Sequence, residues 1–270
     1  MSTRSLLVAL TLCAALLVAL LFSSPVAHAF FEDQYENLEY ALHPSPALAY
    51  EIGARHFDGT NPAEYDIDRA TYFFQLAAEQ DPTYPYLYHE LARISFLKGN
   101  YAHALAQINF QISMHGDSEP NSYYERALIE AYMGDYADAG RDYQYFLKFD
   151  PNGWAGLNDY AWVLLKTGRP HDALDITQQG VARFPDNPWL LNTNSIALYE
   201  VGDIKDAKTQ VQAAETAVAN ITQAQWLQAY PGNDPSIAAE GIAALKHAID
   251  VNMHSILLAS ATSTVQLKQP

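Results

Sequence analysis

Cysteine is almost absent from this sequence of 270 residues, since Cys13 is the single one. It lies in an apolar stretch near the start of the chain, so the rest of the protein has no disulfide and no thiol chemistry. Cationic residues are also few, with 15 Lys and Arg against 31 Asp and Glu and a formal net charge of −16. Because nucleic-acid phosphates require clustered Lys and Arg, this balance excludes a nucleic-acid partner.

Motifs for catalysis, phosphate binding and metal binding are missing as well. The sequence has no Gly-rich phosphate loop and no Gly-x-Ser-x-Gly nucleophile turn. Its nine histidines are scattered, and His89-Glu90 lacks the second His that completes a zinc-binding helix motif. We therefore expect histidines on the surface, no catalytic residue, no metal and no cofactor. An enzyme would require an active site of an unrecognised type in the residues from 222 onward.

The first 29 residues have the pattern of an export signal. Arg4 precedes an apolar run at 6–22, and small residues follow at Ala27 and Ala29. This order predicts a secretory signal, cleaved to leave a chain that begins at Phe30. The alternative is an uncleaved anchor, although the run reaches about 26 Å as a helix against about 30 Å of bilayer hydrocarbon. Either way we expect an exported protein that is periplasmic, secreted or membrane-anchored, with any membrane contact confined to the apolar run.

The chain repeats itself with a period of 34 or 35 residues. Three columns of small residues keep the same register over four copies, which indicates a repeat architecture. The columns are Gly99, Gly134, Gly168 and Gly202; Ala104, Ala139, Ala173 and Ala207; and Ala92, Ala127, Ala161 and Ser195.

One unit is typical of two helices joined by a turn. Apolar residues at 88–97 follow the three–four spacing of an amphipathic helix. Gly99 ends this helix because glycine accepts the left-handed conformation, and a second helix begins near Tyr101. Small residues at Ala92 and Ala104 let the two helices approach closely. The unit is therefore predicted to be an antiparallel helix pair.

The middle of each unit follows a known pattern, as in Gly-Asp-Tyr-Ala-Asp-Ala at 134–139 and Gly-Arg-Pro-His-Asp-Ala at 168–173. Pro82, Pro151 and Pro185 follow second helices, which they end because proline cannot continue a helix. With its period, this pattern resembles the tetratricopeptide repeat (TPR) family. The resemblance implies an all-α fold, a right-handed TPR-type superhelical solenoid of antiparallel helix pairs with a C-terminal helical cap.

The resemblance covers about five repeats. Four are placed at 85–118, 120–153, 154–187 and 188–221, after a divergent copy at 46–84 that has five extra loop residues. Residues 30–45 are expected to be a flexible leader. The last repeat has no closing proline, so we expect its second helix to run on into a cap of one short and one longer helix at 222–258. Residues 259–270 are expected to be a flexible tail.

In the TPR family, the first helices of successive pairs line a concave face that contacts extended peptides. Carried over by register, the resemblance implies an aromatic face here with one firm cation, Arg93. A peptide with apolar side chains, its backbone held by Asn158 and Asn192, suits such a groove. The carboxylate-clamp pattern of the family needs several cationic residues on facing first helices, and this sequence does not have them. Alternatively, these side chains pack between helices. The set is Tyr50, Phe57, His89, Arg93, Phe96, Tyr124, Tyr132, Asn158, Trp162, Asn192 and Tyr199.

These patterns favour an exported scaffold that binds a protein or peptide, for example in assembly of an envelope, pilus or secretion complex. A second hypothesis is a protein that binds carbohydrate or cell-wall polymer, since Trp and Tyr faces stack on sugar rings. A third is a membrane-anchored spacer. The shape of the groove separates the first two, because a sugar needs flat exposed rings beside amides or carboxylates, whereas a peptide needs alternating pockets.

Overall fold

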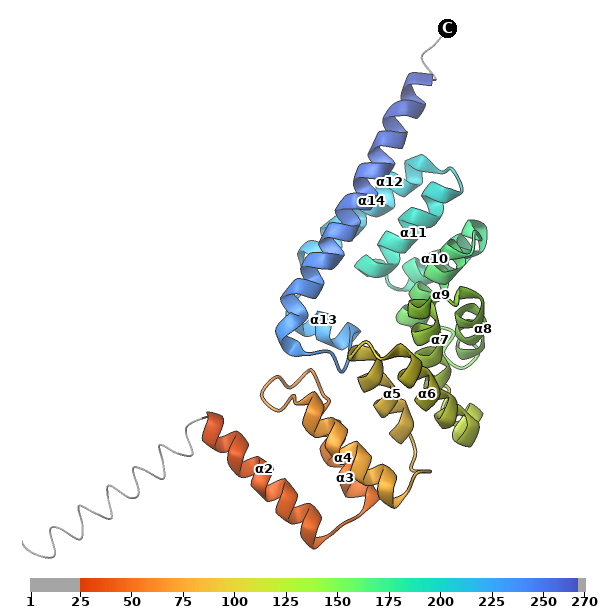
Figure 1. Ribbon diagram of the computed structural model, residues 1–270. Helices are drawn as coiled ribbons and strands as arrows, with labels where there is room; N and C mark the ends of the chain where they lie inside the picture. The colour runs from red at the N-terminus through yellow and green to blue at the C-terminus, as the bar shows by residue number, and fades with distance from the viewer. Residues whose placement is uncertain (1–24, 267–270) are drawn as a thin grey trace, which may run out of the picture.

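The computed structural model describes the backbone of residues 25–266 and side chains from residue 33 to residue 261. In this range every regular element is helical: α-helices α2 to α14 and two short 3-10 turns (Figure 1). Ten of the helices form consecutive antiparallel pairs, as the sequence predicted. The pairs are α3 (Pro46–His56) with α4 (Ile67–Gln80), α5 (Leu87–Leu97) with α6 (Tyr101–His115), α7 (Asn121–Met133) with α8 (Tyr136–Phe146), α9 (Trp154–Lys166) with α10 (Pro170–Arg183), and α11 (Pro188–Glu200) with α12 (Ile204–Ala219).

The small-residue columns lie where the helices of a pair come close. Ala92, Ala127, Ala161 and their counterparts in the second helices are completely buried. The four turn glycines that follow the first helices, Gly99, Gly134, Gly168 and Gly202, have φ values of 71° to 89°. These are left-handed values, which glycine adopts without steric cost. The predicted repeat register is therefore confirmed.

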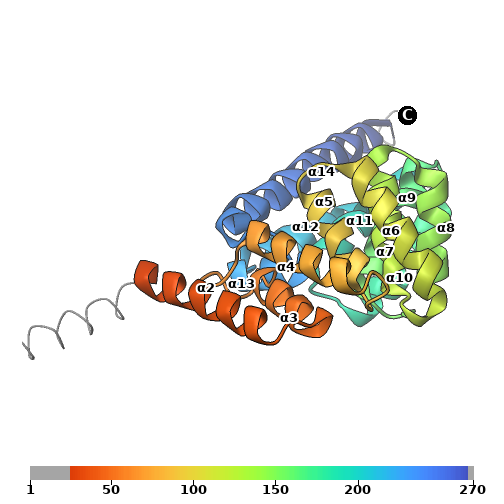
Figure 2. The ribbon, with the colours of Figure 1, turned by 60° about the horizontal axis from the view of Figure 1, so that its bottom comes forward.

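The pairs follow one another around a curve (Figure 2). First helices of successive pairs contact one another: α5 contacts α7, and α9 contacts α11. Within the described residues, second helices of successive pairs make no comparable contacts. Helices that approach one another from pair to pair lie on the inside of a curve, so the first helices line the concave side.

The C-terminal cap consists of α13 (Gln223–Ala229) and α14 (Ala238–Gln266). The last repeat helix does not run on into this cap, contrary to our expectation. α12 ends at Ala219, and Thr222 begins α13 with a capping box, in which its side chain accepts from the Gln225 amide while the Gln225 side chain accepts from the Thr222 amide. Such reciprocal capping starts a new helix without a preceding proline. The region expected as a flexible tail from residue 259 belongs to α14 as far as Gln266.

The leader expected to be flexible is also helical, because α2 spans Pro25–Leu42. Glu36 is buried and forms ion pairs with Arg55 on α3 and Arg69 on α4, at 3.0 and 2.8 Å. Asp33 accepts from Arg69 at 3.0 Å. These charged contacts with the first pair hold the helix in place, and the acidic composition of the leader gave no sign of them.

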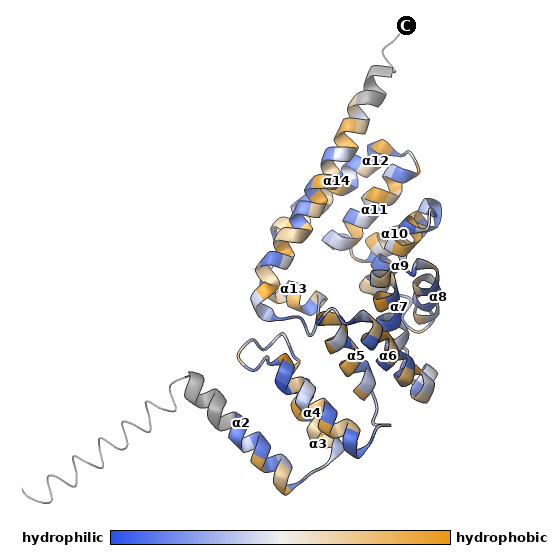
Figure 3. Cartoon of the chain, viewed as in Figure 1, coloured by the Kyte–Doolittle hydropathy of each residue, from blue (hydrophilic) through white to orange (hydrophobic). Residues whose placement is uncertain are grey.

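Hydrophobic and hydrophilic residues alternate along the helices (Figure 3). Among residues 25–266, no helix combines the length and apolar character that a bilayer crossing requires. The predicted signal or anchor at 6–22 lies outside the described residues.

Candidate partner-binding face

Two residues of the predicted face contact other parts of their own chain. The Tyr50 ring on α3 lies 5.4 Å from that of Phe74 and 5.2 Å from that of Tyr84, measured between centroids. His89 on α5 is buried, with its Nδ1 3.3 Å from the Oγ of Ser122. Burial lowers the pKa of His89 to about 4, so the imidazole is neutral at pH 7. His89 is therefore not the surface histidine that we expected.

Tyr124 and Asn158 belong to a hydrogen-bond network between first helices. The Tyr124 hydroxyl donates to Asp159 at 2.6 Å, and the Asn158 amide nitrogen donates to the same carboxylate at 3.0 Å. The Asn158 carbonyl accepts from the Thr193 hydroxyl at 2.8 Å. The network links α7, α9 and α11. The Asn158 side chain that we expected to hold a partner's backbone is thus already engaged through both its oxygen and its nitrogen.

The sequence reading missed a column of acidic residues on the first helices α5, α7 and α9. Glu90, Glu125 and Asp159 each stand nine residues before a turn glycine. Arg93 donates to Glu90 at 2.7 Å, whereas the Oε1 of Glu125, a residue only 5% exposed, has no hydrogen-bond partner among the described residues. Burial raises the pKa of Glu125 to about 7, although nearby Arg93 lowers it, and burial also raises the pKa of Asp159. The period of the repeat could have revealed this column.

Residues 230–234, which we call the strap, cover the end of the face that includes Phe57 and Arg93. The strap connects α13 to α14 and lies beside α5 and the α3–α4 loop (Figure 1). Arg93 donates a hydrogen bond to the carbonyl of Pro231, and its guanidinium lies 4.9 Å from the centroid of the Phe57 ring. Phe57 is itself buried. This end of the predicted face therefore contacts a segment from the C-terminal cap.

The opposite end of the face is covered by α14. The Asn252 side chain donates to Asn192 on α11 at 2.9 Å. Tyr199 packs against the hydrophobic cluster to which Ile249 and Ile256 of α14 contribute. The cap helix therefore occupies the concave side of the last pair, and Asn192 is already bonded.

Between these two covered ends lies an open group of rings, which we call the aromatic strip: Phe96, Tyr101, Tyr132, Tyr136 and Trp162. The Tyr132 ring contacts those of Phe96 and Tyr101 at 4.8 and 6.0 Å, and Tyr136 contacts Trp162 at 5.7 Å. Tyr132 is 63% exposed and Trp162 is 38% exposed. Three of these residues were predicted from the register, whereas Tyr101 and Tyr136, at the starts of second helices, were not.

The comparisons with known proteins support the architecture. No family model matches the chain, and no curated protein matches its sequence. Among solved structures, MamA from AMB-1 aligns with a TM-score of 0.55 and 12% identity, over 64% of this chain and 99% of that one. A second MamA crystal structure aligns with a TM-score of 0.53 and 13% identity, over 64% and 92%. YrrB, described as a TPR protein with an unusual peptide-binding site, aligns with a TM-score of 0.49 and 17% identity, over 70% and 97%.

The fold is TPR-like. Paired helices in register over the repeats, buried small residues between them and the likeness to MamA agree on this point. At such low identity the likeness shows the fold and says nothing about partners.

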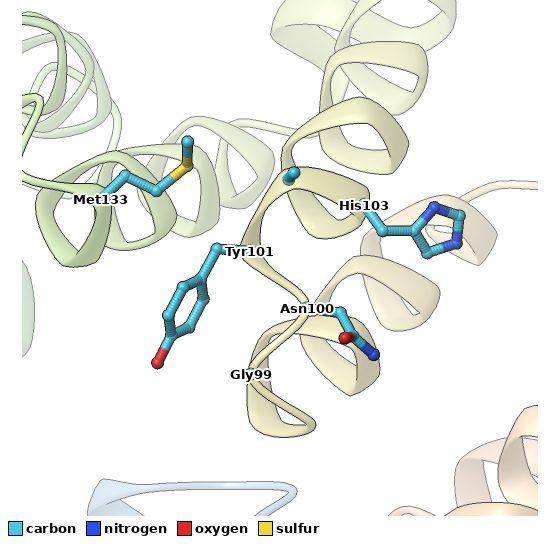
Figure 4. A pocket seen from close by; sticks show the side chains of 6 residues that line it. Gly99, Asn100, Tyr101, His103 and Met133 are labelled. Carbon is cyan, nitrogen blue, oxygen red and sulfur yellow. The ribbon is translucent and has the colours of Figure 1, made fainter.

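A shallow hollow on the TPR-like solenoid lies at the α5–α6 turn, next to the aromatic strip. It is lined by residues 99–103 and Met133. Figure 4 shows that the side chains of Asn100, Tyr101 and His103 point in different directions. They do not converge on a common point, as the acid, base and nucleophile of a catalytic site must.

Asp33, Glu36 and His56 form the one group of potential metal ligands among the described residues, with ligand atoms within 4.8 Å of one another. Cationic side chains already compensate these carboxylates, as described for Arg55 and Arg69. His56 is buried, with its Nε2 2.8 Å from Glu36, and is a second histidine that we wrongly expected on the surface. The group is best described as an ion-pair network that attaches α2 to the first TPR-like pair.

Proposed function

We propose that this chain is a non-catalytic scaffold that binds a protein partner, and that the aromatic strip is the contact surface. The observation that supports this is the exposure of Tyr132 and Trp162, at 63% and 38%, in the middle of a face whose two ends are covered. Large aromatic side chains provide contact area while few rotatable bonds have to be fixed. A TPR-like fold also favours partners that are proteins or peptides.

The ring geometry favours a peptide over a sugar. Phe96 and Tyr132 meet with their planes at 87°, and Tyr136 and Trp162 at 76°. The ammonium of Lys166 lies 5.0 Å from the centroid of the Trp162 ring. Edge-to-face rings produce an uneven surface with gaps between them, in contrast to the flat platform on which a sugar stacks. An extended or helical segment with apolar side chains suits this surface.

We also propose that the protein is exported and that its partner belongs to an envelope, pilus or secretion complex. The basis is the sequence pattern of residues 1–29. Cleavage after Ala29 would leave the part of α2 from residue 30 onward, which includes the buried Glu36. The helix could therefore remain attached to the first pair in the mature chain.

Affinity purification of the tagged full-length chain, followed by mass spectrometry, tests the scaffold. Trp162→Ala and Tyr132→Ala are compared with the parent. Tyr72→Ala is the matched control, because Tyr72 on α4 is 52% exposed but lies outside the strip. If either strip residue is a central anchor, its removal should weaken binding of the recovered partner by about 2 kcal/mol or more. Equal recovery by all variants would show that the strip is not the contact surface.

A further inference from the structure

The strap is held through its backbone by side chains of the first two helix pairs. The carbonyl of Pro231 accepts a hydrogen bond from the Nη2 of Arg93. The next carbonyl, that of Gly232, accepts from the hydroxyl of Tyr65 at 2.9 Å. Side chains that bind consecutive main-chain carbonyls are a general means of holding a peptide. The strap therefore contacts the concave side in the manner of a bound peptide.

Gly232 fills a space that excludes a larger residue. It is buried and has a φ of 82°, a left-handed value that is strained for other residues. A Cβ atom at this position would lie 2.7 Å from the Phe57 ring and 2.9 Å from the Arg93 Nη2. The α3–α4 loop also approaches closely, since a Cβ at Gly59 would lie 2.5 Å from the Asn233 carbonyl oxygen. The site therefore selects glycine.

An aromatic side chain begins the strap. The Tyr230 ring lies 4.9 Å from that of Trp226 and 5.9 Å from that of Trp189 on α11. Trp189 in turn lies 5.1 Å from Trp154 on α9. Burial raises the pKa of Tyr230 to about 12. The strap thus spans the concave side from the first pair to the fourth and fifth, with its aromatic end among indole rings.

The contacts that hold the cap helices do not involve the middle of the strap. α13 packs on α14 through a cluster that includes Trp226 and Ile242. α14 packs on α12 through a cluster that includes Ile249 and Ile256. Because residues 231–234 belong to neither cluster, they can leave their place while both helices stay packed.

We propose that the strap is an intramolecular ligand, and that Phe57, Tyr65 and Arg93 form a peptide-binding site for a partner segment of the same chemistry. That segment has an aromatic residue followed by Pro-Gly, with both carbonyls of the Pro-Gly pair free to accept hydrogen bonds. The inference rests on the proposed function and adds a second site to the aromatic strip. A tethered ligand acts at an effective concentration on the order of millimolar, so the strap keeps the site closed until a partner competes with it.

A labelled peptide with the sequence of residues 229–236 tests this proposal by fluorescence anisotropy. It is titrated into the full-length parent, into Gly232→Ala, and into a Gly-Ser variant whose residues 230–234 are replaced by Ser-Gly-Ser-Gly-Ser, which places a Cβ atom at position 232. Gly99→Ala is the matched control, since Gly99 has a φ of 74° but a Cβ there would meet nothing within 4 Å. Amide hydrogen exchange of residues 228–236 shows whether the strap has opened, and circular dichroism checks that each variant is folded.

The peptide should bind the two strap variants at least about tenfold more tightly than it binds the parent or Gly99→Ala. A peptide in which alanine replaces the glycine should lose this binding. Equal affinity for all proteins, or no binding to the folded Gly-Ser variant, would overturn the proposal. If Gly232→Ala does not fold or does not open, the Gly-Ser variant decides the outcome. The aromatic strip is tested separately, because partner recovery that depends on Trp162 is independent of this peptide.

Discussion

Arg93 on α5 and Pro231 in the strap are joined by a hydrogen bond across 138 residues of sequence. This bond ties the C-terminal cap to the concave side of the second helix pair, and Arg93 is the one cation that the sequence placed on the predicted face. Since the guanidinium is also paired with Glu90 and lies over Phe57, it is engaged before any partner arrives. The part of the face that is open to a partner is therefore the aromatic strip. The end of the face around Arg93 becomes accessible only when the strap opens.

Export is the first prediction, and it concerns the amino terminus. If the proposed export is right, protein isolated from the non-cytoplasmic fraction should have the mass of a chain that begins at Phe30, because Ala27 and Ala29 match the small-residue pattern of a signal cleavage site. Mass spectrometry of the intact protein measures this. Recovery of the complete chain of 270 residues by detergent extraction alone would support the anchor instead.

The packing of the repeats predicts the effect of larger residues at the small positions. Ala139 and Ala173 are completely buried. Replacing either by leucine should destabilise the protein by about 1–3 kcal/mol because the helices cannot separate without losing contacts. Thermal unfolding measures the change. Ala137→Leu, at an exposed position on the same helix as Ala139, is the control and should have little effect.

The exposure of Trp162 predicts a modest effect of its removal on folding. Trp162→Ala should cost less than the roughly 3–5 kcal/mol that is typical of a fully buried large aromatic residue. Phe73→Ala provides that reference, since Phe73 is completely buried. Chemical denaturation of the two variants gives the comparison. A loss for Trp162→Ala as large as that for Phe73→Ala would mean that the ring is part of the core.

Glu125 predicts a stability that depends on pH. Its folded pKa, about 7, lies above the ordinary value of 4.5, so the folded state binds the proton more tightly than the unfolded state. The cost of burying its charge is therefore absent below pH 4.5, grows as the pH rises towards 7, and reaches about 3 kcal/mol above it. Glu125→Gln should raise the melting temperature at pH 8 and change it little at pH 4. Glu200→Gln, at an exposed position, should not show this difference.

The attachment of α2 should also depend on pH. Hydrogen bonds to Glu36 and to the Glu64 carbonyl outweigh burial and raise the pKa of His56 above 6.5, so its contribution is complete below 6.5 and is lost as the pH rises through the raised value. Burial alone would raise the pKa of Glu36, but His56 and Arg69 have the larger combined effect and lower it below 4.5. The contribution of Glu36 to the attachment of α2 is therefore present above pH 4.5 and is lost at lower pH.

Amide hydrogen exchange measures this attachment. The backbone amides of α2 should be protected from exchange most strongly between pH 4.5 and 6.5. Glu36→Gln should reduce the protection of α2 at every pH above 4.5, because Glu36 also pairs with two arginines. His56→Gln should remove the loss of protection at high pH. Glu39→Gln, one turn further along α2, is the control. A profile that does not change with pH in the parent would contradict the role of His56.

The sequence by itself determined the repeat and its register. Ala92 and Ala104 are twelve residues apart, and the same spacing recurs in the four regular units, so the period reveals the helix pairs and their close contact. The aromatic residues of the concave side followed from the same register, and Trp162 and Tyr132 are indeed exposed. These features depend on residues within one unit or on its nearest neighbour, which is why a pattern of 34 residues contains them.

Only the tertiary structure decided which part of the face remains open. Arg93 meets Pro231 across 138 residues and Asn192 meets Asn252 across 60, and neither pair carries a signal in the sequence because the period does not extend into the cap. The same holds for α2, where Glu36 finds its partners in the first pair. A repeat specifies contacts between neighbouring units, whereas the segments before and after it pack by unique contacts. Those of the C-terminal cap cover both ends of the predicted face.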